Sequence, residues 1–207
     1  FTNAVTGLAT AYSDSIPVVL ISGQVPTFMI GTDAFQEIDA VGISRPCVKH
    51  NFLVNSVEEL PRIIKEAFYI ARSGRPGPVH IDIPKNVTSR LGDFVYPKEI
   101  SIPSYKPTYK GNSKQIKKAA AAINEAKRPL LYIGGGAVAS NASEIIRKFM
   151  KKTGIPAVET LMALGVLDAK DKLNLGMAGM HGSYASNMAL SECDLLISLG
   201  ARFCDRV

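Results

Sequence analysis

Short apolar runs alternate with amphipathic segments along the chain, a pattern typical of α/β proteins. Residues 17–21 form an apolar, β-branched run short enough to be a buried strand, and residues 48–54 and 79–83 are two further strand candidates. Residues 3–12 and 56–73 instead repeat apolar positions at helical spacing, and Ser56 with Glu59 form a capping-box signal. Strands that alternate with helices predict a mainly parallel sheet covered on both faces.

The same alternation returns in the second half, after a break. Residues 93–112 lose all periodicity and carry prolines among tyrosines and lysines, as a semi-rigid extended linker does. We therefore expect two three-layer α/β/α units, residues 1–92 and 113–207. The second should contain strands 130–133, 155–159 and 195–199, and helices 113–126 (capped by Ser113), 142–152 and 183–191. Since the chain opens inside a helical pattern and stops just after a strand, we expect both units to be incomplete parts of a longer protein.

The most irregular stretch is Gly23–Asp39, which directly follows the first predicted strand. Pro26 and Gly31 interrupt regular structure there, as Gly23 does at its start. Asp33 lies three residues before Gln36, which predicts a helix start that continues at helical spacing toward residue 41. A loop between the end of a strand and the start of a helix is where open α/β sheets bind ligands.

Composition narrows the class of protein. The 207 residues are 46% hydrophobic and 20% charged, which favours a globular protein with a real core. No apolar run is long enough to span a membrane, so we expect no membrane partner. The net charge of +6 is scattered and comes with no nucleic-acid motif, so we expect no nucleic-acid partner either. The cysteines, Cys47, Cys193 and Cys204, are odd in number and lack C-x-x-C spacing, which predicts a reducing cytoplasm and no metal site.

A glycine-rich turn follows the strand at 130–133. Gly134-x-Gly136-x-x-Ala139 matches the dinucleotide fingerprint, with Glu159 about 20 residues on, where a ribose-binding acid would lie. Backbone N–H groups could then approach a pyrophosphate. The alternative is a tight strand–helix turn that binds no ligand.

Other polar side chains each have a functional and a structural interpretation. Arg202 and Arg206 suit bidentate binding of a carboxylate, or belong to a surface ion-pair cluster. His181 lies in a glycine loop, as a cofactor shelf or a hydrogen-bonded spacer, whereas His50 and His80 have no partner pattern and are expected to be structural. The sequence contains no G-x-S-x-G, H-E-x-x-H or P-loop motif, which weighs against serine hydrolases, zinc peptidases and P-loop ATPases.

Six motifs together resemble one family. They are GQVPTFMIGTDAFQE, DIPKNVT, YIGGGA, ETLMALG, GMAGMHG and GARFCDRV. In this order, and over nearly the whole chain, they resemble the catalytic large subunit of acetohydroxyacid (acetolactate) synthase, a thiamine diphosphate (ThDP) enzyme.

The resemblance implies a domain assignment and a reaction. Residues 1–92 would be the C-terminal part of the ThDP pyrimidine-binding domain, and 113–207 the N-terminal part of a central, FAD-binding domain. The intact enzyme would decarboxylate pyruvate on ThDP and condense the two-carbon unit with pyruvate or 2-ketobutyrate, in branched-chain amino-acid biosynthesis. The family's essential glutamate would precede Phe1, and the Mg²⁺ and diphosphate ligands would follow Val207. We therefore expect this chain alone to be inactive.

The resemblance also implies site residues. Catalytic contacts with ThDP and the 2-keto acid map onto Gln24 and Arg206, although simple backbone capping is the alternative for Gln24 and Gln36. Cys204 replaces the first aspartate of the family's FDDRV. The substrate and herbicide channel maps onto Val25, Pro26, Ala34, Phe35, Gln36, Lys85 and Asp205. The FAD contacts map onto Arg75, Gly134, Gly135, Gly136, Thr160, Leu161, Met162, Met180, His181, Gly182, Gly200, Ala201 and Arg202.

Family members assemble with active sites between subunits, so we expect a homodimer or homotetramer and a separate regulatory small subunit. Competing hypotheses remain within the ThDP enzymes, namely glyoxylate carboligase and pyruvate oxidase, although GTDAFQE with GMHG favours the synthase. Outside them, an NAD-dependent oxidoreductase or a non-catalytic nucleotide-binding module could use the glycine-rich turn.

Overall fold

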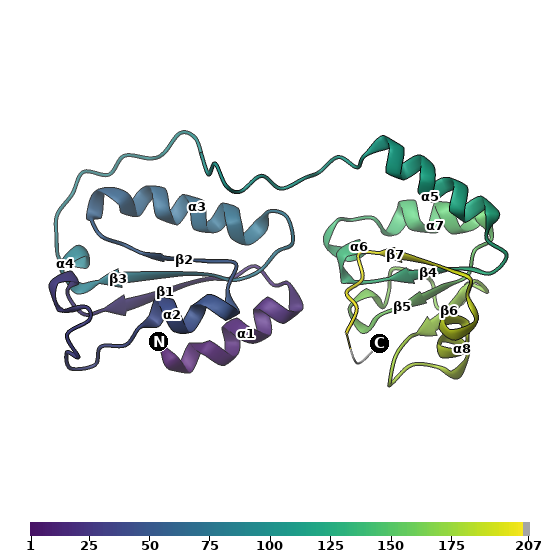
Figure 1. The fold of residues 1–207 in the computed structure, drawn as a ribbon, viewed down its shortest axis with the longest axis horizontal. Coiled ribbons are helices and arrows are strands. Elements are labelled where there is room, and N and C mark those ends of the chain that lie inside the picture. Colours follow the sequence, from purple (N-terminus) through teal and green to yellow (C-terminus); the bar gives the residue numbers. More distant parts are fainter. Residues whose placement is uncertain (205–207) are drawn as a thin grey trace. The chain divides into compact units, whose positions relative to one another are not determined.

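The structure, a computed structural model, describes residues 1–204 of the chain. The chain divides into two compact units, Phe1–Lys110 and Gly111–Val207, which are described separately (Figure 1). No helix in the described part is both long and apolar enough to cross a membrane. Both units are α/β with parallel strands, which confirms the predicted fold class.

The first unit is built on a three-stranded sheet with the order β1-β3-β2. Figure 1 shows α3 on one side of this sheet and α1 and α2 on the other. The elements are η1 Thr2–Ala4, α1 Val5–Asp14, β1 Val19–Gln24, η2 Thr27–Met29, α2 Ala40–Ser44, η3 Arg45–Cys47, β2 His50–Leu53, η4 Val57–Glu59, α3 Leu60–Arg72, β3 Val79–Pro84 and α4 Lys85–Thr88.

The central strand β3 is buried along its whole length. Because side chains alternate across a strand, Val79, Ile81 and Ile83 pack on one face, in a core shared with the buried face of α3. His80 and Asp82 therefore lie on the opposite face, toward α1 and α2. One face of this sheet is thus apolar and the other carries a buried polar pair.

Two helix starts differ from the sequence prediction. No helix begins at Asp33: Asp33 and Gln36 have φ of 56° and 62°, and β1 runs on through Gly23. Helix α2 begins later, at Ala40, because the Asp39 carboxylate accepts the Gly42 amide at 2.7 Å and caps it. The loop is therefore longer and less regular than its composition suggested.

The capping box predicted for the next helix is also wrong. Ser56 makes no side-chain cap bond, and α3 begins at Leu60 after the single turn η4. Pro61 then lies in the first turn of α3, where its missing N–H costs nothing.

The second unit contains a four-stranded sheet with the order β6-β5-β4-β7. Strand β6 was not expected from the sequence, and α5 is capped by Asn112, whose side chain accepts two backbone amides, rather than by Ser113. The elements are α5 Ser113–Glu125, β4 Pro129–Ile133, α6 Gly135–Ala139, α7 Ser143–Thr153, β5 Ala157–Glu159, η5 Leu161–Ala163, β6 Asn174–Met177, α8 Tyr184–Glu192 and β7 Leu195–Leu199.

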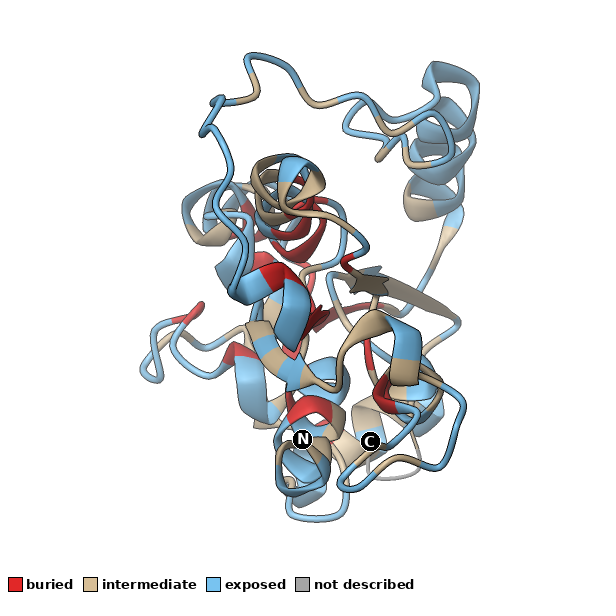
Figure 2. Cartoon of the chain, turned by 90° about the vertical axis from the view of Figure 1, so that its left-hand side faces the viewer, coloured by how far each residue is buried: buried red, intermediate tan, exposed pale blue. Residues whose placement is uncertain are grey.

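Strand alternation also divides the core of this unit in two. Leu131 and Ile133 of β4 pack with Met150 of α7, whereas Leu130 and Tyr132 pack on the opposite face, toward α8. Figure 2 colours the chain by burial and shows buried residues in strands, in helices and in some of the connecting loops. Both faces of the sheet are thus covered, as its almost continuous apolar strands require.

The predicted linker contains no helix or strand before Ser113. Its middle is nevertheless attached to the first unit, because the Tyr105 hydroxyl donates to the Ser73 carbonyl at 2.8 Å and accepts from Lys49 Nζ at 3.1 Å. The contacts of the first unit accordingly extend to Lys110.

Candidate functional site

Five of the predicted channel residues, Val25, Pro26, Ala34, Phe35 and Gln36, belong to the loop 25–39, which leaves the C-terminal end of β1. Gln24, the last residue of β1, holds both ends of this loop with one side chain. Its Nε2 donates to the Ile38 carbonyl at 2.8 Å, and its Oε1 accepts the Val25 amide at 2.8 Å. Nε2 also lies 3.1 Å from Asp82 Oδ2. The capping interpretation of Gln24 therefore describes its contacts in this structure, and its predicted catalytic role stays a prediction.

Glu37 folds the middle of the loop around its carboxylate. One oxygen accepts the Gly31 amide and the other accepts the Ala34 amide at 3.0 Å. These backbone hydrogen bonds, that of Gly31 first, lower the pKa of Glu37 below its ordinary value. The loop is thus a closed turn with its own internal hydrogen bonds.

This arrangement leaves aromatic side chains exposed at the edge of the sheet. Phe28 and Phe35 are 77% and 88% exposed, so two large apolar side chains of one loop are open to solvent. Val25, Pro26 and Ala34 are half-buried, and Gln36 is exposed. The apolar members therefore form an accessible surface.

Lys85 is brought to the same edge from the neighbouring strand. It directly follows β3 and is exposed at the start of α4. The next residue, Asn86, accepts the Thr27 amide at 2.9 Å, which ties α4 to the loop. Parallel strands bring their C-terminal ends together, so residues about 60 positions apart in the sequence meet here.

Beneath the loop lies a buried polar network that sequence reasoning did not identify. Ser22 donates to Asp82 Oδ1 at 2.5 Å and lies 2.7 Å from His80 Nε2, while His80 Nδ1 lies 3.0 Å from Ser44 Oγ. Burial lowers the pKa of His80, and the Asp82 carboxylate partly offsets this. The pattern S-G-Q followed by H-I-D on the neighbouring strand was the available signal.

This network does not have the geometry of a hydrolase triad. In a triad the acid contacts the histidine nitrogen that is not bonded to the serine. Here Asp82 bonds the same serine, and the second nitrogen of His80 faces Ser44. The expectation that His80 is structural agrees with these contacts.

In the second unit, the predicted cofactor residues all follow the C-terminal ends of strands. Gly134–Gly136 follow β4, Thr160–Met162 follow β5, Met180–Gly182 come after β6, and Gly200–Arg202 follow β7. In the sheet order, β5 and β6 lie on one side of β4 and β7 lies on the other, which makes β4 a topological switch point. The structure thus brings these four segments to one sheet edge, the place where such sheets bind ligands.

The glycine-rich turn at this edge contacts the chain itself. The Gly134 amide donates to the Leu199 carbonyl at 3.0 Å, and the Gly136 amide to the Gly200 carbonyl at 2.9 Å. A Cβ on Gly134 would lie 2.2 Å from the Cα of Ala201. These glycines therefore allow two backbone segments to cross closely, and those two amides are not available to a pyrophosphate.

Apolar side chains project from the same edge. Leu161, Met162, Met180 and Phe203 are each more than half exposed. His181 is also exposed, whereas Gly182 packs tightly, since a Cβ there would lie 2.4 Å from the Met177 carbonyl oxygen. The edge thus presents exposed apolar side chains, while the Gly134 and Gly136 amides are engaged by the chain itself.

The expectation that Glu159 binds a ribose is wrong for this structure. Its side chain is buried, and it accepts the Leu167 amide at 3.1 Å and the Asn174 side-chain amide at 3.3 Å. Burial raises its pKa above the ordinary value, although these hydrogen bonds act in the opposite direction. Glu159 holds together the loop that precedes β6.

The predicted arginines have separate places. Arg75 belongs to the first unit, where Nε donates to Ser15 Oγ at 2.8 Å and the guanidinium bonds the last carbonyls of α1. The Arg202 carbonyl lies 3.5 Å from the Tyr132 hydroxyl. Asp205 and Arg206 lie outside the described residues.

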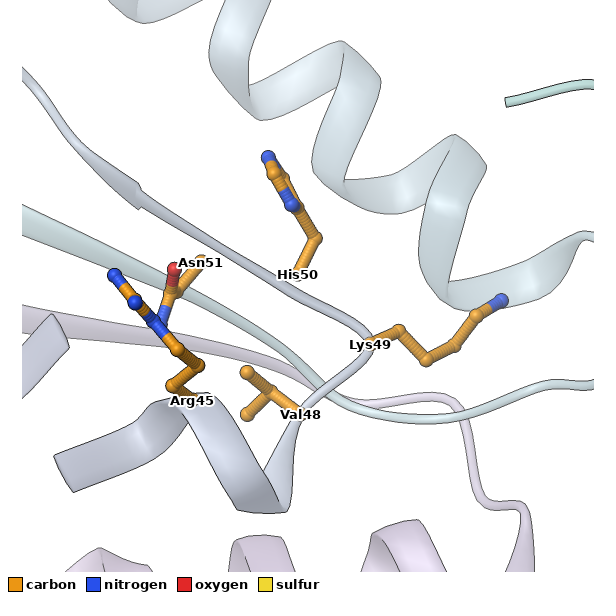
Figure 3. A pocket seen from close by; sticks show the side chains of 5 residues that line it. All are labelled: Arg45, Val48, Lys49, His50 and Asn51. Carbon is orange, nitrogen blue, oxygen red and sulfur yellow. The ribbon is translucent and has the colours of Figure 1, made fainter. Parts of the chain in front are cut away.

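Two shallow pockets of the first unit lie at the start of β2 and beside Arg75. The larger, about 290 Å³, is drawn in Figure 3. Its two cationic side chains, Arg45 and Lys49, point away from each other, and Lys49 Nζ donates to the carbonyls of Ile70 and Ser73. Among residues 1–204 no three His, Cys, Asp or Glu side chains are placed to hold a metal ion. Neither observation indicates a second site. The lining residues are Arg45, Val48, Lys49, His50 and Asn51.

Comparison with protein families gives two matches. Residues 1–43 match the family described as "Thiamine pyrophosphate enzyme, N-terminal TPP binding domain", and residues 116–207 match "Thiamine pyrophosphate enzyme, central domain". Thiamine pyrophosphate is another name for ThDP. The two matches fall on the two units of the structure.

Curated relatives are similar along the whole chain. It is 51% identical over 207 residues to the acetolactate synthase large subunit of Buchnera aphidicola subsp. Schizaphis graminum, covering 99% of this chain and 36% of that protein. It is 47% identical over 207 residues to the acetolactate synthase isozyme 3 large subunit of Escherichia coli K12, with the same coverage. It is 52% identical over 206 residues to acetolactate synthase of Mycobacterium bovis, covering 100% of this chain and 33% of the relative.

The chain spans about a third of the length of these relatives. The resemblance noted from six motifs is confirmed by these identities and by both domain matches. The chain belongs to the thiamine pyrophosphate enzyme family, in the branch of the acetolactate synthase large subunits.

Proposed function

We propose that the full-length protein is an acetolactate synthase that decarboxylates pyruvate and condenses the two-carbon unit with a second pyruvate or with 2-ketobutyrate, for valine, leucine and isoleucine biosynthesis. The observation that supports this most is 47–52% identity with acetolactate synthases along the whole chain. When bound, ThDP with Mg²⁺ supplies the electron sink for decarboxylation. The residues of this chain bind and orient substrate.

In this proposal the loop 25–39 and Lys85 form one wall of the substrate entrance. Exposed Phe35, with Val25, Pro26 and Ala34, supplies apolar surface that excludes water from the reacting atoms. Lys85 attracts the carboxylate of the incoming 2-keto acid. Arg206, a bidentate binder of a 2-keto acid carboxylate, and Asp205 are further proposed substrate residues; both lie outside the described residues.

We further propose that the C-terminal edge of the second sheet binds FAD. The exposed apolar side chains of Leu161, Met162 and Met180 suit the ring system of a flavin. The amides of Gly134 and Gly136 are already bonded, so the glycine turn provides close packing instead of phosphate contacts. The flavin would have a structural role.

The assembly and location follow the family. We propose a homodimer or homotetramer in the cytoplasm, with a separate regulatory small subunit. The chain 1–207 alone should make no acetolactate.

The deciding experiment uses the full-length protein with pyruvate, Mg²⁺ and FAD, and measures acetolactate with and without ThDP. Product formed only with ThDP supports the proposal. Lys85→Ala should then raise KM for pyruvate, because its charge no longer attracts the carboxylate. Lys148→Ala, which removes another exposed lysine, from α7, should not change it.

The main competitor from another class, an NAD-dependent oxidoreductase, needs an acid for the ribose hydroxyls. Both Glu159 oxygens are engaged inside the protein, which argues against it. Oxidation of NADH without ThDP, and no acetolactate, would nevertheless establish that alternative and refute the synthase.

A further inference from the structure

The buried carboxylate of Asp82 is bonded on both sides. Asp82 lies on β3 with no exposed surface. Oδ1 accepts the Ser22 hydroxyl at 2.5 Å and Oδ2 accepts Gln24 Nε2 at 3.1 Å. A buried carboxylate is stable only when its oxygens are bonded in this way. Its two partners are alternate residues of β1, so the register Ser22↔Asp82 and Gln24↔Pro84 places them side by side with it.

The hydrogen-bond roles in this network are restricted by the number of available protons. A carboxylate only accepts, so the Ser22 hydroxyl proton is directed at Asp82. The contact between Ser22 Oγ and His80 must then be a bond donated by His80 Nε2. His80 Nδ1 can accept from Ser44, whose hydroxyl can alternatively donate to the Val41 carbonyl. Asp82 thus orients Ser22 on one side while it orients Gln24 on the other.

Orienting Gln24 has a consequence for the loop. The amide group of a glutamine can adopt two orientations that exchange Oε1 and Nε2. Only one of them places Nε2 toward both Asp82 and the Ile38 carbonyl. In that orientation Oε1 faces the Val25 amide. Asp82 therefore favours, together with the Ile38 carbonyl and the Val25 amide, the orientation in which one side chain joins the start of the loop to its end.

We propose that Asp82 is a positioning residue that, through Gln24, fixes the loop 25–39 at the substrate entrance. Its effect on the loop follows from these contacts alone, whereas its effect on substrate rests on the proposed function. Asp82 itself is buried under β1 and α2 and is not a catalytic residue.

The test replaces Asp82 by Asn in the full-length protein. An amide that retains the Ser22 bond presents N–H₂ to Gln24 Nε2, two donors face each other, and Gln24 must turn. We expect the Val25 amide to exchange with solvent about tenfold faster, because its hydrogen bond is lost. We also expect KM for pyruvate to rise more than kcat falls. If Asp82→Asn does not fold, Gln24→Leu should show the same faster exchange at the Val25 amide. Where both variants fold, the double variant should exchange no faster than Gln24→Leu alone.

Glu66→Gln is the matched control. Glu66 is a buried carboxylate of the same unit, but its partner is Arg62 on its own helix. It should leave exchange at Val25 unchanged. Unchanged exchange at Val25 in folded Asp82→Asn would overturn the positioning role. Faster exchange with an unchanged KM would support that role and overturn the assignment of the loop to substrate.

Discussion

Replacing Gly134 by alanine would place a methyl group inside the backbone of the segment that follows β7. The new Cβ would lie 2.2 Å from Ala201 Cα, 2.4 Å from the Gly200 carbonyl oxygen and 2.7 Å from the Ala201 amide nitrogen. All three are backbone atoms, so no side chain can rotate away. Gly134 itself has φ of −115°, which alanine adopts readily, and backbone strain is therefore not the cause.

The size of the effect follows from these contacts. Overpacking of a well-packed interior costs about 1–3 kcal/mol. Moving the segment also breaks the hydrogen bond from the Gly134 amide to Leu199, which contributes about 1 kcal/mol. We therefore expect Gly134→Ala to lower the free energy of unfolding of the second unit by roughly 2–4 kcal/mol.

The adjacent glycine supplies the control. A Cβ on Gly135 would meet only the Met162 side chain at 3.0 Å, with the Met162 carbonyl oxygen at 3.5 Å. A small shift of this exposed segment relieves that contact, so Gly135→Ala should cost at most about 1 kcal/mol.

The measurement is urea unfolding in which hydrogen exchange of the β4 and β7 peptides is the readout. Reading these peptides separates the second unit from the first, since two units need not unfold in one step. If Gly134→Ala lies within about 0.5 kcal/mol of the parent, the close crossing of the two segments is not a packing requirement. The glycine would then have to be explained by a ligand.

Three further predictions concern other parts of the chain. Because burial raises the pKa of Glu159, the unfolded state releases its proton first, so stability of the second unit should fall as pH rises above about 4.5, and Glu159→Gln should flatten that slope in pH-dependent urea unfolding. Asn112→Ala should cost about 1 kcal/mol in the same assay, whereas Ser113→Ala, whose side chain makes no cap bond, should cost little. In the first unit, buried Ile81→Ala should lower the free energy of unfolding by about 2–5 kcal/mol in thermal or urea unfolding. Exposed Phe35→Ala should change it by no more than about 0.5 kcal/mol, yet raise KM for pyruvate. Equal losses of stability would contradict the burial difference.

The sequence by itself determined the class of fold and the segments that form the edges of the sheets. Apolar runs of the right length marked β1, β4 and β7, because a buried parallel strand is often apolar on both faces, whereas β3 was marked by alternate apolar residues between Pro78 and Pro84. Three of the predicted cofactor segments follow predicted strands, so parallel pairing of those strands would bring them to one edge, whereas Met180–Gly182 follow β6, which the sequence did not predict. The six motifs indicated the family that the chain resembles.

Only the tertiary structure decided where local signals compete with packing. Asp33 has the composition of a helix start, but the Glu37 carboxylate binds the Gly31 and Ala34 amides and holds that segment as a loop. Strand β6 has weak local preference and forms because it pairs with β5.

The same holds for the buried polar groups. Glu159 has the spacing of a ribose ligand, yet its bonds to Leu167 and Asn174 come from a loop whose path no spacing rule predicts. Ser22 and Asp82 are about 60 positions apart and become partners only through the register of β1 on β3. The sequence gives the functional group of each side chain, but the tertiary structure determines which partner that group contacts.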